Sequence, residues 1–142
     1  MDWKILAISV PLFFVSYQAL AKILPKGASL FLVNAYASLI GAALMLSLHL
    51  LTQKDKSLSL TPKMLSYALG IGLLIGLGNF GIMKAYNLGA PQSMFTIIFY
   101  VALIIYGTIV GLVLFHEKLQ PLQILGALLA CFGLFLVVYF KK

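Results

Sequence analysis

Five long apolar stretches constrain the fold of this chain more than any other feature of its sequence. Each has about the 20 apolar residues that an α-helix needs to cross the hydrocarbon core of a bilayer. Because lipid offers no hydrogen-bonding partners, the backbone of each stretch must pair within itself, which favours helices. The sequence therefore predicts an all-α integral membrane protein, with residues 1–142 forming a single five-helix transmembrane repeat. The predicted spans are residues 3–24, 28–51, 64–88, 92–115 and 122–140.

Short connections that contain helix-ending residues separate the spans. Pro25 and Gly27 lie in the first connection, and Gly89 and Pro91 lie in the third. Proline cannot donate a backbone hydrogen bond, and glycine readily adopts the conformations of tight turns. The longest and most polar connection, residues 52–63, leaves no room for a soluble domain.

Charged residues are rare and lie at the margins of the apolar stretches. Only 9% of the residues are charged and 63% are hydrophobic, whereas a soluble domain has roughly 25% charged residues. The net charge of +7 comes from ten lysines, which form no basic stripe of the kind that binds nucleic acid. Their positions suit loops anchored at lipid headgroups. We therefore expect the lipid bilayer, and no nucleic acid, as a partner.

The first span has a second interpretation as a cleaved signal peptide. Lys4, the apolar run after it and the sequence Ala19-Leu20-Ala21 resemble a signal peptide with its cleavage site. Cleavage would leave four spans, although the apolar run is long for a signal. Mass spectrometry of the purified chain decides between the two, because an N-terminus at Lys22 would exclude the five-helix prediction.

The lysines do not select an orientation in the membrane. Positive residues usually remain on the cytoplasmic side, but five spans place equal numbers of lysines on the two sides. Two hypotheses fit this balance, namely a weak bias toward one orientation and insertion of copies in both orientations. The N-terminal side has Lys4, Lys54, Lys56, Lys63 and Lys118, and the other side has Lys22, Lys26, Lys84, Lys141 and Lys142.

An ordered set of motifs lies in the second half of the chain. Residues 83–90 read Met-Lys-Ala-Tyr-Asn-Leu-Gly-Ala, residues 115–119 read Phe-His-Glu-Lys-Leu, and Gln123, Gly126 and Gly133 follow. This set resembles the drug/metabolite transporter superfamily, in particular its EamA-like repeat, where a Gly-Glu-Lys/Arg-Leu turn precedes the last helix. His116 departs from the pattern, since the family often has glycine there. A more distant similarity is to the four-helix small multidrug resistance proteins.

The resemblance implies a secondary transporter built from one half of a ten-helix inverted-repeat fold. The family's common form has two such repeats, and this chain supplies one. Because an odd number of spans inverts the second copy, an antiparallel homodimer with dual topology would restore the symmetry that alternating access uses. A parallel dimer about an axis along the membrane normal stays open as an alternative. We expect a multi-pass protein of a cell membrane, inner or plasma, in a prokaryote.

Polar side chains within the spans are the candidate lining of a substrate cavity. Such groups avoid lipid, so they face the protein interior or water, where they bind substrate or simply join helices. In the family the first four helices surround the cavity, and the resemblance implies the same here. Lys84 has a second interpretation, because its long side chain can reach the headgroups, and Tyr86, Tyr106 and Tyr139 are predicted interface aromatics. The cavity candidates are Gln18, Asn34, Ser38, Asn79, Lys84, Thr96 and Tyr100.

Small residues recur at helical spacing in the last two spans. Gly107 and Gly111 lie in the fourth span, and Gly126, Ala130 and Gly133 lie in the fifth. Spacings of four and seven residues place small side chains on one helix face, where backbones can approach closely. Both helix packing within a subunit and a dimer interface fit this pattern. For the strip in the fifth span we favour the dimer interface, because the four-helix relatives use a similar strip in that way.

The absence of mid-membrane carboxylates limits the function. Asp2, Asp55 and Glu117 all lie outside the spans, whereas small multidrug resistance proteins exchange cations for protons on a carboxylate in their first helix. The sequence therefore favours transport of a small polar metabolite, neutral or zwitterionic, over cation or drug export of that type. We find no motif for catalysis, a cofactor or a metal, which predicts that the protein is not an enzyme. A non-transporting accessory membrane subunit is the alternative from a different class.

Overall fold

Five α-helices make up the computed structural model, which describes residues 3–139. Each described helix is long and apolar enough to cross a membrane. This confirms the predicted all-α fold class with five spans. Phe140, the predicted end of the fifth span, lies outside the described residues. The helices are α1 (Trp3–Lys22), α2 (Leu30–Thr52), α3 (Pro62–Asn87), α4 (Gln92–Leu114) and α5 (Pro121–Tyr139).

The chain divides into two compact units, residues 1–89 and residues 90–142. Unit 1 contains α1, α2 and α3, and unit 2 contains α4 and α5. In unit 1, α3 contacts both α1 and α2, and in unit 2, α4 contacts α5. The prediction that residues 1–142 form a single five-helix transmembrane repeat stays a prediction.

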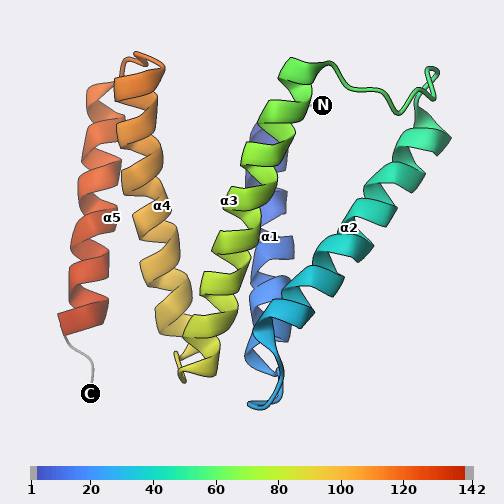
Figure 1. The fold of residues 1–142 in the computed structure, drawn as a ribbon. Coiled ribbons are helices and arrows are strands. Elements are labelled where there is room, and N and C mark those ends of the chain that lie inside the picture. Colours follow the sequence, from blue (N-terminus) through green and yellow to red (C-terminus); the bar gives the residue numbers. More distant parts are fainter. Residues whose placement is uncertain (1–2, 140–142) are drawn as a thin grey trace. The chain divides into compact units, whose positions relative to one another are not determined.

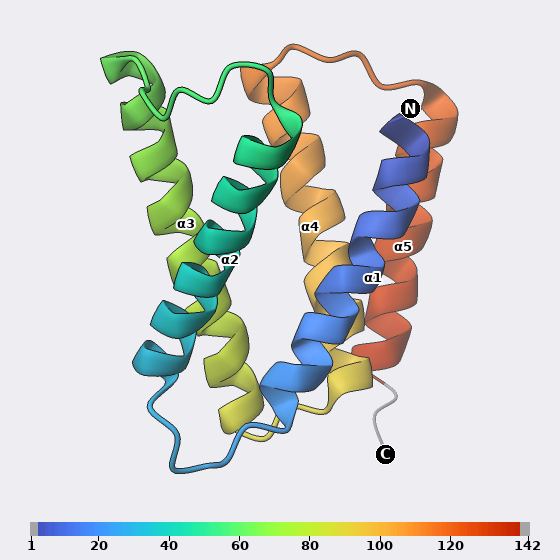
Figure 2. The ribbon, with the colours of Figure 1, turned by 90° about the vertical axis from the view of Figure 1, so that its right-hand side faces the viewer.

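The helices of unit 1 approach one another at one end. The helices α2 and α3 lie closest near the connection between α1 and α2 and diverge toward the connection of residues 53–61 (Figure 1). At the close end, the rings of Phe31 and Phe80 stack with their centroids 4.6 Å apart. Figure 2 shows that the C-terminal ends of α1 and α3 also lie close together. This end of unit 1 is therefore where side chains from different helices meet.

Local sequence explains where the helices of unit 1 begin and end. The side chains of Ser29 and Thr61 accept hydrogen bonds from backbone N–H groups in the first turns of α2 and α3, which stabilises both helix starts. Pro62 follows at the first helical position, where its missing N–H has no cost. Beyond α3, Gly89 has φ 93°, and its N–H donates to the Tyr86 carbonyl at 2.9 Å. Glycine suits this left-handed turn because it has no Cβ.

Most large apolar side chains of the described helices are exposed, and neither α2 nor α5 has a buried residue. Such a surface suits hydrocarbon as the surrounding solvent, because lipid removes the cost of exposing apolar groups. The buried residues of unit 1 instead gather in the C-terminal parts of α1 and α3. They are Gln18, Ala21, Ile82, Met83 and Tyr86.

Candidate functional site

Gln18 is the one polar side chain that is fully buried among the described residues, with 0% of its surface exposed. It lies on α1, and its Oε1 accepts a hydrogen bond from the hydroxyl of Tyr86 on α3 at 3.2 Å. Tyr86 is itself 6% exposed. Because a buried amide is costly unless it is hydrogen-bonded, this contact joins α1 to α3 specifically. The Gln18–Tyr86 pair is the central feature of the candidate site.

The sequence prediction for Tyr86 as an aromatic residue of the membrane interface missed this role. Tyr86 lies near the end of α3, as such aromatics often do, but its side chain points into unit 1 and meets Gln18. One feature of the sequence could have indicated that Tyr86 lies near Gln18. Helices α1 and α3 are separated by one other span and therefore run in the same direction, so residues near their C-terminal ends lie at similar depth.

A second contact joins the same two helices. The hydroxyl of Tyr17, the neighbour of Gln18 on α1, donates to the backbone carbonyl of Asn79 at 3.2 Å. Asn79 lies two turns before Tyr86 on α3 and is half-buried. The contact uses the Asn79 backbone, so the amide side chain of Asn79 has no part in it. Polar groups of α1 and α3 thus meet at two levels of the helix pair.

Asn34 makes the corresponding contact between α2 and α3. Its Nδ2 donates to the carbonyl of Gly76 at 2.9 Å. Its Oδ1 is buried, and no donor in the described part of the chain, residues 3–139, hydrogen-bonds to it. Ser38, one turn further along α2, is exposed and donates to the Asn34 carbonyl at 2.8 Å. Asn34 therefore holds α2 to α3 with its amide N–H and keeps a buried acceptor without a donor among the described residues.

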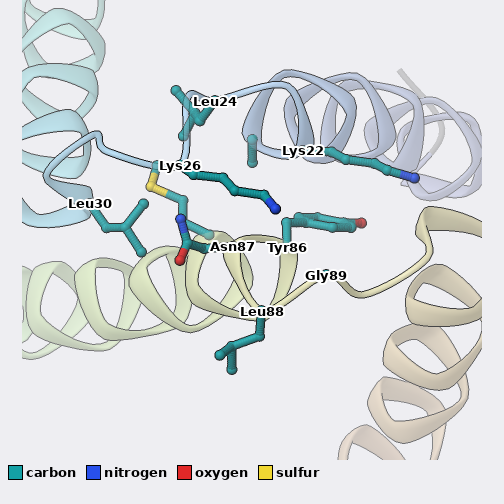
Figure 3. A pocket seen from close by; sticks show the side chains of 10 residues that line it. Lys22, Leu24, Lys26, Leu30, Tyr86, Asn87, Leu88 and Gly89 are labelled. Carbon is teal, nitrogen blue, oxygen red and sulfur yellow. The ribbon is translucent and has the colours of Figure 1, made fainter.

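A pocket of about 210 Å³ lies in unit 1, at the C-terminal ends of α1 and α3 (Figure 3). None of the seven predicted cavity residues lines it. Lys84 is exposed and lies outside this lining, whereas two lysines that we expected only as loop anchors, Lys22 and Lys26, line it. The other lining residues are Ala21, Leu24, Leu30, Met83, Tyr86, Asn87, Leu88 and Gly89.

Thr96 and Tyr100, the remaining cavity candidates, lie in unit 2. They are one turn apart on α4, and both are half-buried. The ring of Phe99 meets that of Tyr100 edge to face, with centroids 5.5 Å apart. The prediction that Thr96 and Tyr100 line a substrate cavity stays a prediction, as it does for the candidates in unit 1.

The end of α4 is closed by a local turn that uses Gly111. The Glu117 N–H donates to the Gly111 carbonyl at 3.0 Å. A Cβ added to Gly111 would lie 2.7 Å from Oε2 of Glu117, so the space beside this glycine is filled from within the same unit. Between them, His116 has φ 51°, a left-handed conformation that glycine adopts most easily. The EamA-like pattern often has glycine at this position.

The small residues of α5 do not line the apolar hollow that α5 shares with α4. Ile124, Ala127 and Cys131 of α5 line an apolar hollow together with Thr108 and Leu112 of α4. At about 100° per residue, Gly126, Ala130 and Gly133 project away from these three lining residues of α5. Gly126 is exposed, whereas Ala130 and Gly133 are half-buried. In the part of the chain that is described, no atom other than those of the local backbone lies within 4 Å of a Cβ built at Gly107, Gly126 or Gly133. Their role in a dimer interface stays a prediction.

The comparisons with known proteins identify one family. The model of the EamA-like transporter family matches residues 1–139, a range that includes α1 with Gln18. No curated protein and no solved structure shows a significant match. Over residues 3–139, no group of three or more His, Cys, Asp or Glu side chains could hold a metal ion.

Proposed function

Because this chain belongs to the EamA-like transporter family, a family of membrane transporters and not of enzymes, we propose that it moves a small polar metabolite, neutral or zwitterionic, across a cell membrane of a prokaryote. The observation that carries the proposal is that the described helices contain no carboxylate, and that the polar groups that meet between them, such as Gln18 and Tyr86, are amides and hydroxyls. Amide and hydroxyl groups recognise uncharged polar groups by hydrogen bonds. They provide no negative charge to hold a cation.

The positions of the acidic residues argue against a proton carrier within the spans. Asp55 and Glu117 lie in connections between helices, and Asp2 lies outside the described residues. Transport should therefore persist when each of the three is replaced by its amide. An amide variant that inserts and folds normally but loses proton-driven transport would show that the coupling differs from this proposal.

A solute counterflow experiment tests the function directly. The purified chain in liposomes should give saturable counterflow with at least one neutral or zwitterionic metabolite of a panel that also contains quaternary ammonium cations. Preference for the cations would contradict the proposal in favour of a drug exporter. Absence of any transport, together with a stable complex with another membrane protein, would favour an accessory subunit.

Accessibility of the polar residues gives a second test. In a Cys131→Ser background, cysteines at Asn34, Asn79 and Tyr100 should react with a membrane-impermeant thiol reagent, because we expect these positions to face water within the membrane. A cysteine at Leu39, an exposed apolar position of α2, is the matched control and should remain unreactive in lipid. Unreactive thiols at all three polar positions would refute a wet cavity.

The proposal includes an antiparallel homodimer that works by alternating access. The chain is one EamA half-unit, and two oppositely inserted copies would generate the inverted arrangement that alternating access uses. The equal numbers of lysines on the two sides are compatible with insertion in both orientations. A tag after Lys142 should therefore be found on both sides of the membrane.

Added lysines test the dimer further. Two or three lysines added to one side should lock the orientation, because positive residues are retained on the cytoplasmic side. Each locked variant alone should be inactive, and co-expression of the two opposite variants should restore transport. If one locked variant transports as well as the parent chain, the dimer is parallel or absent.

A further inference from the structure

Two lysines line the pocket at the C-terminal ends of α1 and α3. Lys22 is the last residue of α1, and Lys26 lies in the connection to α2. Figure 3 shows the Lys26 side chain extending toward the Tyr86 ring. Asn87, the last residue of α3, adds an amide to the lining. The Lys22 side chain extends in the other direction, past the Tyr86 hydroxyl (Figure 3). The lining therefore has two positive charges, with the Lys26 ammonium beside the base of Tyr86 and the Lys22 ammonium further out.

No carboxylate of the described part of unit 1 neutralises these charges. Asp55 is the only acidic residue in residues 3–89. It lies in the connection beyond the far end of α2, which has 23 residues and is therefore about 35 Å long. This distance far exceeds the screening length of about 8 Å at physiological ionic strength.

The helix ends around the pocket reduce its positive charge only in part. Lysines near a helix C-terminus interact favourably with the helix dipole, so Lys22 and Lys26 have a structural role at the end of α1. The dipole of each helix is equivalent to roughly −0.5 charge at this end. Two helix ends therefore offset about one of the two positive charges, and the pocket retains an attraction for an anion.

The size and depth of the pocket restrict the anion. Its volume of about 210 Å³ is below the range of roughly 300–1,000 Å³ typical of sites for drug-sized ligands. It lies at the ends of two membrane spans, the level at which lipid phosphates are found. Leu24, Leu30 and Leu88 give it apolar walls, which suit the glycerol and acyl parts that follow a headgroup phosphate.

We infer that this pocket binds a phosphate ester, the group shared by phospholipid headgroups and small water-soluble phosphates. Lys26 Nζ donates to a phosphate oxygen, the Asn87 amide adds a donor, and the charge of Lys22 adds attraction from further out. Tyr86 borders the pocket with its ring, while its hydroxyl is used by Gln18. The inference is independent of the proposed solute, because its test measures binding and not transport.

A binding experiment on the full chain tests the inference. The purified protein in a neutral detergent is titrated in one arm with phosphatidylglycerol and in the other with glycerol phosphate, and binding is followed by native mass spectrometry and by the unfolding temperature. Each lysine near a membrane surface contributes about 1 kcal/mol of attraction, or about a fivefold change in affinity. The Lys22→Gln/Lys26→Gln variant should therefore bind about 25-fold more weakly in the arm in which the wild type binds.

Matched variants separate the pocket from general electrostatics. Lys54→Gln/Lys56→Gln removes the same charge from the exposed connection beyond α2 and should retain binding within twofold. Lys22→Arg/Lys26→Arg should also retain binding, because the charge stays. Asn87→Asp leaves both lysines intact but introduces a negative charge into the lining, so it should weaken binding of the phosphate. This variant tests the pocket even if the Lys22→Gln/Lys26→Gln variant does not fold.

The two arms identify the source of the phosphate. Binding in the lipid arm alone assigns the pocket to a lipid headgroup, and binding of glycerol phosphate assigns it to a soluble ester. The inference is overturned if neither compound binds the wild type. It is also overturned if the pocket variants and the Lys54/Lys56 control lose affinity equally, since binding would then depend on net charge alone.

Discussion

The two units of the molecule differ in what holds their helices together. In unit 1, side-chain hydrogen bonds join α3 to both of its neighbours, through Tyr86 to α1 and through Asn34 to α2. In unit 2, α4 and α5 are more apolar than the helices of unit 1, and they share an apolar hollow that Thr108 and Cys131 help to line. Polar contacts within a span specify which helices meet, whereas apolar contacts alone are less selective. From this difference we expect solute recognition to depend more on unit 1 than on unit 2.

The largest expected effect is on transport after substitution of Gln18. Gln18→Leu removes a buried amide and the acceptor of the Tyr86 hydroxyl, and a lost hydrogen bond of this kind costs about 1–3 kcal/mol. We expect counterflow of the transported solute to fall about 10- to 100-fold. Thr108→Val, a polar-to-apolar change in unit 2, is the control and should stay within twofold of the wild type. A larger effect of Thr108→Val would contradict the expected dependence on unit 1.

The next largest expected effect is on dimer formation. Gly126→Leu and Gly133→Leu add side chains at positions where a Cβ would have no atom beyond the local backbone within 4 Å among the described residues, so the single chain should fold. If the α5 strip contacts a second copy, the dimer dissociation constant should rise about tenfold, a loss of about 1.4 kcal/mol. Gly78→Leu in α3, which also has open space beside it, is the control for added bulk. Unchanged dimer affinity in both α5 variants would remove the strip from the interface.

A smaller effect is expected for the coupling between α1 and α3. A double-mutant cycle with Gln18→Leu and Tyr86→Phe should give a coupling of about 0.6 kcal/mol and at most about 1.7 kcal/mol, the range found for hydrogen bonds between helices in membranes. Unfolding in detergent provides the measurement. The same cycle with Tyr36→Phe, at an exposed position of α2, should give no coupling. Equal coupling in the two cycles would mean that the Gln18–Tyr86 contact is not specific.

The smallest expected effect is a gain in stability at the turn after α4. His116 has φ 51°, a conformation that costs a residue with a Cβ roughly 1–2 kcal/mol. Glycine avoids this strain, but its greater freedom in the unfolded chain cancels part of the gain in stability. His116→Gly should therefore stabilise the protein by about 0.5–1 kcal/mol, seen as a higher unfolding temperature. Gln53→Gly, at the end of α2 with φ −84°, should be destabilising. A loss of stability in His116→Gly would show that the imidazole has a role of its own.

The candidate site could be predicted only in part. The sequence singled out Gln18 and Asn34 as polar groups that need partners inside a membrane, and both make contacts between helices, whereas their place in a substrate cavity stays a prediction. It did not identify Tyr86 as the partner of Gln18, because the two residues are 68 positions apart. Nor did it distinguish Ser38, which is exposed and bonded within its own helix, from Asn34 on the preceding turn.

The sequence by itself determined the class of the protein, because the number and length of apolar spans are local properties and the bilayer demands helices from them. It also determined that no carboxylate lies within a span, which limits the chemistry of transport. Only the tertiary structure decided that Tyr86 points toward Gln18, that Lys22 and Lys26 share a pocket, and that Glu117 covers Gly111. These features depend on the rotation of each helix about its axis and on turns between segments. Helix rotation and turn geometry are not encoded by one segment alone, because they follow from how the side chains of different segments pack together.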